Sequence, residues 1–272
     1  MTEKINQVKE ILSQMDRALV AYSGGIDSTL VAKLAFDVLG ENAIAVTADS
    51  PSLLPEDLED AISQAKTIGI PHKIIKTQEL EDPNYASNPV NRCYFCKSEL
   101  YGQLKPLAQE MGFPYVLDGV NADDLNDYRP GIQAAKERGT RSPLAEAGLS
   151  KLDIRQATQK LDLPWWDKPA QPCLSSRFPY GENITAEKLQ RVGQAERYLR
   201  NLGYRVLRVR SSEDTARIEL PVSEISSFMQ NTDLEQLVQM FKGFGFTYVT
   251  LDSEGFQSGK LNQNITPAAI SL

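Results

Sequence analysis

Ser23-Gly24-Gly25-Ile26-Asp27-Ser28 follows a short apolar run at 19–22 and precedes residues that are apolar at helical spacing. This pattern predicts a strand, a glycine turn and the start of a helix. Glycines let the backbone approach a phosphate, and the first N–H groups of a helix attract anions. Ser23, Asp27 and Ser28 add hydroxyls and a carboxylate that could cap the helix or hold Mg²⁺. We interpret the turn as a nucleotide site; an ordinary Gly-rich turn of a βαβ unit is the alternative.

The composition narrows the class of protein. The chain has 272 residues and a formal net charge of −7, which argues against a broad basic surface for nucleic acid. It lacks the run of about eighteen apolar residues that a membrane span needs, and residues 1–4 open an amphipathic helix instead of a signal peptide. We therefore expect a cytoplasmic protein with no membrane partner. Three cysteines, an odd number, argue against a disulfide framework.

The first half alternates strands and helices. We expect strands at 43–49, 73–75 and 115–119, and helices at 55–68, 96–111 and 151–161. This alternation predicts an α/β fold with a doubly wound parallel sheet. Ligands of such sheets bind beyond the carboxyl ends of the strands, so the turns at Ser23, Asp49 and Asp118 should face one crevice.

The second part has a different character. Prolines interrupt 164–179, and we place the domain boundary after residue 180. Residues 181–272 predict a smaller α+β domain, with helices at 186–202 and 224–243 and strands at 204–210, 215–220 and 248–251.

The three cysteines are compatible with several kinds of site. Cys93 and Cys96 form a C-x-x-C pair, and Cys173 lies far away in sequence. Such a pair suits a redox dithiol, half of a zinc site, or an iron–sulfur cluster. A Cys₃His zinc site would need the lone His72, which is more simply explained by packing. A [4Fe–4S] cluster with three protein ligands would leave one iron open for a sulfide. Alternatively Cys173 donates its own sulfur, or the cysteines are unrelated.

The Ser23–Ser28 stretch resembles the S-G-G-x-D-S loop of the PP-loop ATP pyrophosphatases, and the Gly-Lys-Ser/Thr of a Walker loop is absent. Members of that superfamily cleave ATP between the α- and β-phosphates and transfer AMP to a carbonyl or carboxylate oxygen. Nitrogen or sulfur then attacks the activated carbon. The resemblance makes 1–180 a PP-loop domain and 181–272 a substrate-binding domain.

Further stretches resemble the LarE family, the ATP-dependent sulfur transferases of nickel-pincer nucleotide synthesis. They lie at 117–121, 126–131, 141–144, 173–181, 208–210 and 216–220 and span nearly the whole chain. In that family, ATP adenylates the two carboxylates of a pyridinium-3,5-biscarboxylic acid mononucleotide, and sulfur replaces AMP to give thiocarboxylates. The resemblance implies a homo-oligomer, with a hexamer as one form, and a nucleotide site with Mg²⁺ formed by Ser23, Gly24, Gly25, Asp27, Ser28, Asp49 and Gly119.

The same resemblance bears on the sulfur source. Some relatives have a single donor cysteine and are sacrificial. Others have three cysteines and a [4Fe–4S] cluster that carries the transferred sulfur, and this sequence falls with them. Cys93, Cys96 and Cys173 are then the cluster ligands and the catalytic cysteines, with a sulfide donor as partner.

Basic and acidic residues of the second part suit a small anionic substrate. Arg208 and Arg210 alternate on a predicted strand and so share one face, where two guanidiniums could hold a phosphate. A solvated strand face is the alternative. Arg177, beside Ser176, could meet a carboxylate or phosphate near Cys173. LarE proteins place acidic residues like Glu196 and Glu219 near substrate or a cation.

Two questions stay open at this point. Asp123, Asp124 and Asp127 suit a Mg²⁺ or switch loop and equally a solvated acidic loop. The function could also be that of another PP-loop thiolase, an amidating synthetase, or a nucleotide-binding iron–sulfur sensor without turnover. An amidating synthetase would not need the three cysteines, and the acidic charge weakens a tRNA thiolase.

Overall fold

The computed structural model describes residues 2–126, 129–169 and 172–264. The chain divides into two compact units. The first unit comprises Met1–Glu79 and Arg92–Gln171, and the second comprises Leu80–Asn91 and Pro172–Leu272. The domain boundary expected after residue 180 stays a prediction. Each helix within the described ranges is too short or too polar to cross a membrane.

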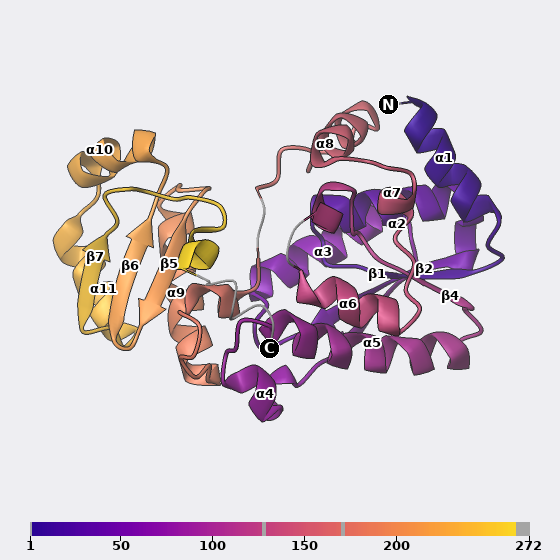
Figure 1. Ribbon diagram of the computed structural model, residues 1–272. Coiled ribbons are helices and arrows are strands. Elements are labelled where there is room, and N and C mark those ends of the chain that lie inside the picture. Colours follow the sequence, from indigo (N-terminus) through magenta and orange to yellow (C-terminus); the bar gives the residue numbers. More distant parts are fainter. Residues whose placement is uncertain (1, 127–128, 170–171, 265–272) are drawn as a thin grey trace. The chain divides into compact units, whose positions relative to one another are not determined.

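A four-stranded sheet forms the centre of the first unit, in the order β3-β2-β1-β4 and parallel throughout (Figure 1). The strands are β1 (Ala18–Ala21), β2 (Ala43–Asp49), β3 (His72–Lys76) and β4 (Tyr115–Leu117). In register, Leu19 lies between Ile44 and Val116. Because the strands are parallel, the turns that follow β1, β2 and β4 emerge at the same edge of the sheet.

Helices cover both faces of this sheet (Figure 1). Side chains alternate along a strand, so Val20 packs into one apolar cluster and Leu19 into the other. The first cluster receives α1 (Thr2–Ser13), α2 (Ile26–Leu39), α3 (Pro55–Ile68), α7 (Pro143–Glu146) and α8 (Lys151–Lys160). The second receives α5 (Arg92–Glu110) and α6 (Pro130–Glu137). The doubly wound α/β class predicted from the alternation is confirmed.

A three-stranded sheet forms the second unit, in the order β5-β6-β7. Its strands are β5 (Arg208–Ser212), β6 (Thr215–Glu219) and β7 (Tyr248–Leu251); β6 pairs antiparallel with β5 and parallel with β7. Its helices are α4 (Pro83–Ala86), α9 (Ala186–Asn201), α10 (Val222–Asn231) and α11 (Leu234–Gly243). Backbone bonds from Gly181 N to Asn88 O (2.8 Å) and from Ile184 N to Ala86 O (2.8 Å) hold the 80–91 segment in this unit.

Three local predictions are wrong. The helix expected at 224–243 is two helices, because the Asp233 side chain accepts a hydrogen bond from Gln236 N and caps a new helix. The strand expected from 204 begins at Arg208. The helix expected from Cys96 begins at Arg92, so both cysteines of the C-x-x-C pair lie in its first turns.

Candidate active site

The turn between β1 and α2 is fixed by its own hydroxyls. Ser28 Oγ lies 3.1 Å from Ser23 Oγ, accepts a hydrogen bond from Ser23 N at 3.2 Å and contacts Gly25 O at 3.1 Å. Gly25 is the N-cap residue of α2, and no side chain caps this helix. The first amides of α2 therefore point out of the turn without a side-chain acceptor, which is the arrangement that binds phosphate.

Two of the nearby glycines are required by close packing. Gly24 has φ +70°, and a Cβ there would lie 2.8 Å from Ala61 Cβ. Gly119 follows β4, and a Cβ on it would lie 2.7 Å from Ser28 N. The turn after β4 thus touches the backbone at the start of α2. This contact brings together the turns of Ser23 and Asp118, as expected, while Asp49 ends β2 at the same edge.

Asp27 stands in the first turn of α2 with an unusual charge environment. Burial raises its pKa from 3.8 to about 6, the nearby Asp124 adds to the rise, and Lys151 and Arg129 oppose it. Two neighbouring carboxylates and the phosphates of a nucleotide are the ligands that Mg²⁺ commonly takes in proteins. Asp27 and Asp124 are therefore the residues that could hold this ion.

Asp124 is buried and forms ion pairs with two cations, so it is not part of a solvated acidic loop. Its Oδ1 lies 3.0 Å from Arg129 Nη2 and 3.3 Å from Lys151 Nζ. Asp123 accepts a hydrogen bond from Lys151 N at 2.8 Å. Asp127 lies outside the described residues.

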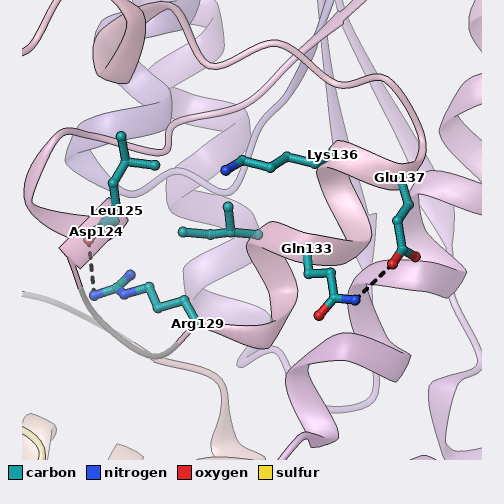
Figure 2. Close-up of a pocket in the computed structure, with 7 residues that line it drawn as sticks. Asp124, Leu125, Arg129, Gln133, Lys136 and Glu137 are labelled. Carbon is teal, nitrogen blue, oxygen red and sulfur yellow. Dashed lines mark hydrogen bonds and ion pairs between the residues drawn. The ribbon is translucent and has the colours of Figure 1, made fainter.

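A cavity of about 330 Å³ opens beside Asp124. Figure 2 shows Arg129 reaching Asp124 on one side and Gln133 reaching Glu137 on the other, with Lys136 extending between them. Its remaining lining residues are Leu125 and Ile132. A cavity of this size, beside the carboxylate that influences Asp27, could accept a small molecule next to the phosphate loop.

The C-x-x-C pair lies at the same edge of the sheet as this loop. Cys93 is exposed and Cys96 is partly buried, and both are free thiols. Tyr101, farther along α5, lies close enough to Cys96 to interact electrostatically with it, and its hydroxyl donates to Asp118 Oδ2 at 3.4 Å. Burial raises the pKa of Asp118, the residue before Gly119. A short chain of side chains therefore links Cys96 with the turn that packs on the phosphate loop.

The spacing of the pair suits one shared ligand, because residues three apart in a helix lie on one face. Cys173, also a free thiol, belongs to the second unit. The described residues contain no group of three or more His, Cys, Asp and Glu side chains placed to hold a metal ion. His72 packs edge-on against Tyr22, and its Nε2 lies 2.8 Å from Thr47 Oγ1, so packing accounts for it.

In the second unit, Arg177 is clamped between a carboxylate and the backbone of the Cys173 loop. It donates to both carboxylate oxygens of Glu196 at 2.8 Å, and both side chains are buried. It also donates to the carbonyls of Pro172 at 2.6 Å and Cys173 at 3.1 Å. Burial raises the pKa of Glu196, but the charge of Arg177, its hydrogen bonds, the bond from Val209 N and the charge of Arg208 together outweigh burial, and the net pKa is lowered. Arg177 is therefore bonded both to Glu196 and to the backbone of the Cys173 loop, and the contact with a substrate carboxylate or phosphate stays a prediction.

Arg208 and Arg210 join this network, so the solvated-face alternative is wrong. Arg210 donates to Glu219 Oε2 at 3.1 Å and to Ser176 O at 2.7 Å. Arg208 is buried against Phe256. Burial, and then the charge of Arg177, lower the pKa of Arg208 to about 10. A guanidinium whose pKa is lowered by burial and by neighbouring arginines marks a site where an anion is favoured.

The sequence alone missed three residues of these sites, Tyr101, Lys151 and Lys168. Lys168 Nζ lies 3.5 Å from Gly24 O and 3.0 Å from Asp60 Oδ2. Each residue is brought to the edge of the sheet by tertiary structure, and none belongs to a motif. The amphipathic pattern around Tyr101 could have shown it to be buried, but not that it reaches Asp118.

The half-buried Asp27 should make the first unit less stable as pH rises. Because its folded pKa of about 6 exceeds the ordinary 3.8, the folded state keeps a proton that the unfolded chain loses between these values. Asp27→Asn should therefore gain about 2 kcal/mol of unfolding free energy relative to the wild type as the pH rises from about 4 to about 7. Urea unfolding across this pH range measures the difference.

The exposed Asp16 provides the control, since Asp16→Asn should follow the wild type throughout. An Asp27→Asn curve parallel to the wild type would contradict the burial of this carboxylate.

The comparisons with known proteins agree with this geometry. Residues 3–87 match the NAD synthase family model. A protein of Synechocystis is 65% identical over 98% of this chain and 99% of its own. The pyridinium-3,5-bisthiocarboxylic acid mononucleotide synthase of Lactiplantibacillus plantarum is 42% identical over 96% of this chain and 94% of its own. A protein of Methanocaldococcus jannaschii is 30% identical over 93% of this chain and 95% of its own. The chain belongs to the LarE family, whose nucleotide domain is of the PP-loop type.

Proposed function

We propose that this protein is an ATP-dependent sulfur transferase that converts the carboxylates of a pyridinium-3,5-biscarboxylic acid mononucleotide to thiocarboxylates. The observation that carries the proposal is a phosphate loop and a C-x-x-C pair at the same edge of one sheet, linked through Tyr101 and Asp118. The synthase from Lactiplantibacillus plantarum, whose name states the bisthiocarboxylic product, supports the substrate.

The first unit would bind and activate ATP. The amides of Gly25 to Ser28 receive the phosphates, and Asp27 with Asp124 would hold Mg²⁺ on them. A substrate carboxylate oxygen attacks the α-phosphorus. The new O–P bond forms as the bond to the β-phosphate oxygen breaks, and pyrophosphate leaves. The product is an acyl adenylate, whose carbonyl carbon accepts a sulfur nucleophile as AMP departs.

The second unit would bind the substrate phosphate. Arg208 and Arg210 share one face of β5, and Arg208 has a depressed pKa that an added anion would relieve. Glu219 orients Arg210, and Glu196 orients Arg177. Arg177 in turn holds the carbonyl of Cys173, so the backbone that carries this thiol is fixed.

The chemistry of the three cysteine side chains suits a [4Fe–4S] cluster. Cys93 and Cys96 are free thiols one helical turn apart at a helix start, and Cys173 supplies a third thiol. Thiolates are the usual ligands of such clusters. We propose that these three residues would hold it, and that when bound it would supply the transferred sulfide. A cluster and free thiols suit a reducing compartment, so we place the protein in the cytoplasm, as a homo-oligomer with a sulfide donor as partner.

Turnover should release pyrophosphate only when the dicarboxylate substrate is present. With ATP, Mg²⁺ and sulfide under anaerobic conditions, each carboxylate converted should release one pyrophosphate, because each requires its own adenylation. Mass spectrometry of the product should show the gain expected for sulfur in place of oxygen. A pyridinium mononucleotide with one carboxylate is the matched control and should stop after one event.

In a parallel reaction with ammonia in place of sulfide, a small mass loss, as nitrogen replaces oxygen, would instead identify an amidating synthetase. Nucleotide binding with no pyrophosphate release under any of these conditions would identify a sensor.

The cysteines should act together in the cluster mechanism. Alanine at Cys93, Cys96 or Cys173 should each abolish bound iron and labile sulfide in anaerobically purified protein, because two thiolates rarely hold a cluster. Tyr94→Phe, between the two cysteines, removes a hydroxyl that bonds Glu137 and Ser98 but leaves every thiol in place, and should retain the iron. The wild type should keep its intact mass after turnover.

Sacrificial donation predicts the opposite pattern. Cys173 alone would matter, turnover would stop near one event per subunit, and the spent protein would be lighter by the mass of H₂S. Dehydroalanine at Cys173 in a protein without iron would overturn the cluster mechanism.

A further inference from the structure

Lys168 follows α8 and places its ammonium group at the phosphate loop. Its Nζ lies 3.5 Å from the carbonyl oxygen of Gly24 and 3.0 Å from Asp60 Oδ2 on α3. The Lys168 side chain is only 13% exposed, whereas that of Asp60 is 58% exposed. A positive charge is therefore held, mostly out of water, against a residue of the loop that begins the nucleotide site.

The contacts of Lys168 do not by themselves explain its burial. Removing an ammonium from water is costly, and an ion pair with a largely exposed carboxylate returns little of that cost. An ammonium has three N–H donors, and Asp60 and Gly24 account for two of them. A second anion, present only in the liganded protein, would use the third donor and offset the burial.

We propose that Lys168 binds the phosphates of ATP. Its charge adds to that of the α2 amides on the same loop, and a flexible four-carbon stem lets Nζ move from Gly24 O to a phosphate oxygen. The charge would also stabilise the pyrophosphate that leaves during adenylation. This inference rests on ATP use at the Ser23–Ser28 loop.

A purely structural role makes a different prediction. In that case the ion pair with Asp60 ties the segment after α8 to α3, and loss of either partner has the same effect. The variants Lys168→Met and Asp60→Asn separate the two explanations. The second breaks the tether but leaves the ammonium at the loop.

The test is calorimetric binding of Mg-ATP, ADP and adenosine to the full chain. Lys168→Met should weaken ATP by about tenfold to a hundredfold, the range for loss of one charge-assisted contact. The loss should be smaller for ADP and absent for adenosine. Asp60→Asn should change ATP affinity by less than about threefold. Lys168→Arg, which keeps the charge, should recover part of the loss.

Lys33→Met is the matched control, because Lys33 lies on α2 but pairs with Asp37 in the same helix. It should bind ATP as the wild type does. A loss of ATP affinity in Asp60→Asn equal to that in Lys168→Met would show that the ion pair acts as a tether, and would overturn the proposal. Equal losses of affinity for ATP, ADP and adenosine would also overturn it. Unchanged ATP affinity in Lys168→Met would overturn it as well. If the wild type bound no ATP, the proposed function would fail together with this inference.

Discussion

A backbone-to-backbone contact between two turns organises the nucleotide site. Gly119, after β4, lies so close to the start of α2 that a Cβ would come within 2.7 Å of Ser28 N. Gly24 makes a similar approach to Ala61 in a left-handed conformation. These contacts leave the first turn of α2 partly exposed, with Ser28 buried and Asp27 half-buried. Burial raises the pKa of Asp27. Tyr101 of α5, the helix that carries the C-x-x-C pair, bonds Asp118 in the turn before Gly119.

The two units differ in how their buried charged side chains are paired. In the second unit, Glu196 is fully paired with Arg177, and the pair is held by further backbone bonds, which is the condition under which buried ions are tolerated. Burial, and then the charge of Arg177, lower the pKa of Arg208, and the charge of Glu196 only partly opposes them. In the first unit, burial, and then the charge of Asp124, raise the pKa of Asp27. One unit is thus suited to an anion and the other to a cation on phosphates.

The sequence predicts the architecture well because its signals are local. Alternating apolar strands and amphipathic helices, with a glycine turn after the first strand, give the doubly wound sheet. Predictions failed where one side chain decides the outcome, as at Asp233, whose cap divides a long apolar stretch into two helices. The Arg177–Glu196 pair and the position of Lys168 depend on contacts between distant segments, which no local pattern encodes.

The central claim is that ATP phosphates enter the loop because its backbone is uncovered at Gly25. Gly25 has φ −78° and ψ 156°, and a Cβ there meets only Ser23 Oγ, at 3.4 Å. Gly25→Val should therefore fold as the wild type does. The most direct measurement is the Kd of Mg-ATP for this variant, with Gly102→Val on α5, where a Cβ meets open space, as the control. The account predicts an ATP affinity at least about tenfold weaker in Gly25→Val alone; wild-type affinity in that variant would contradict it.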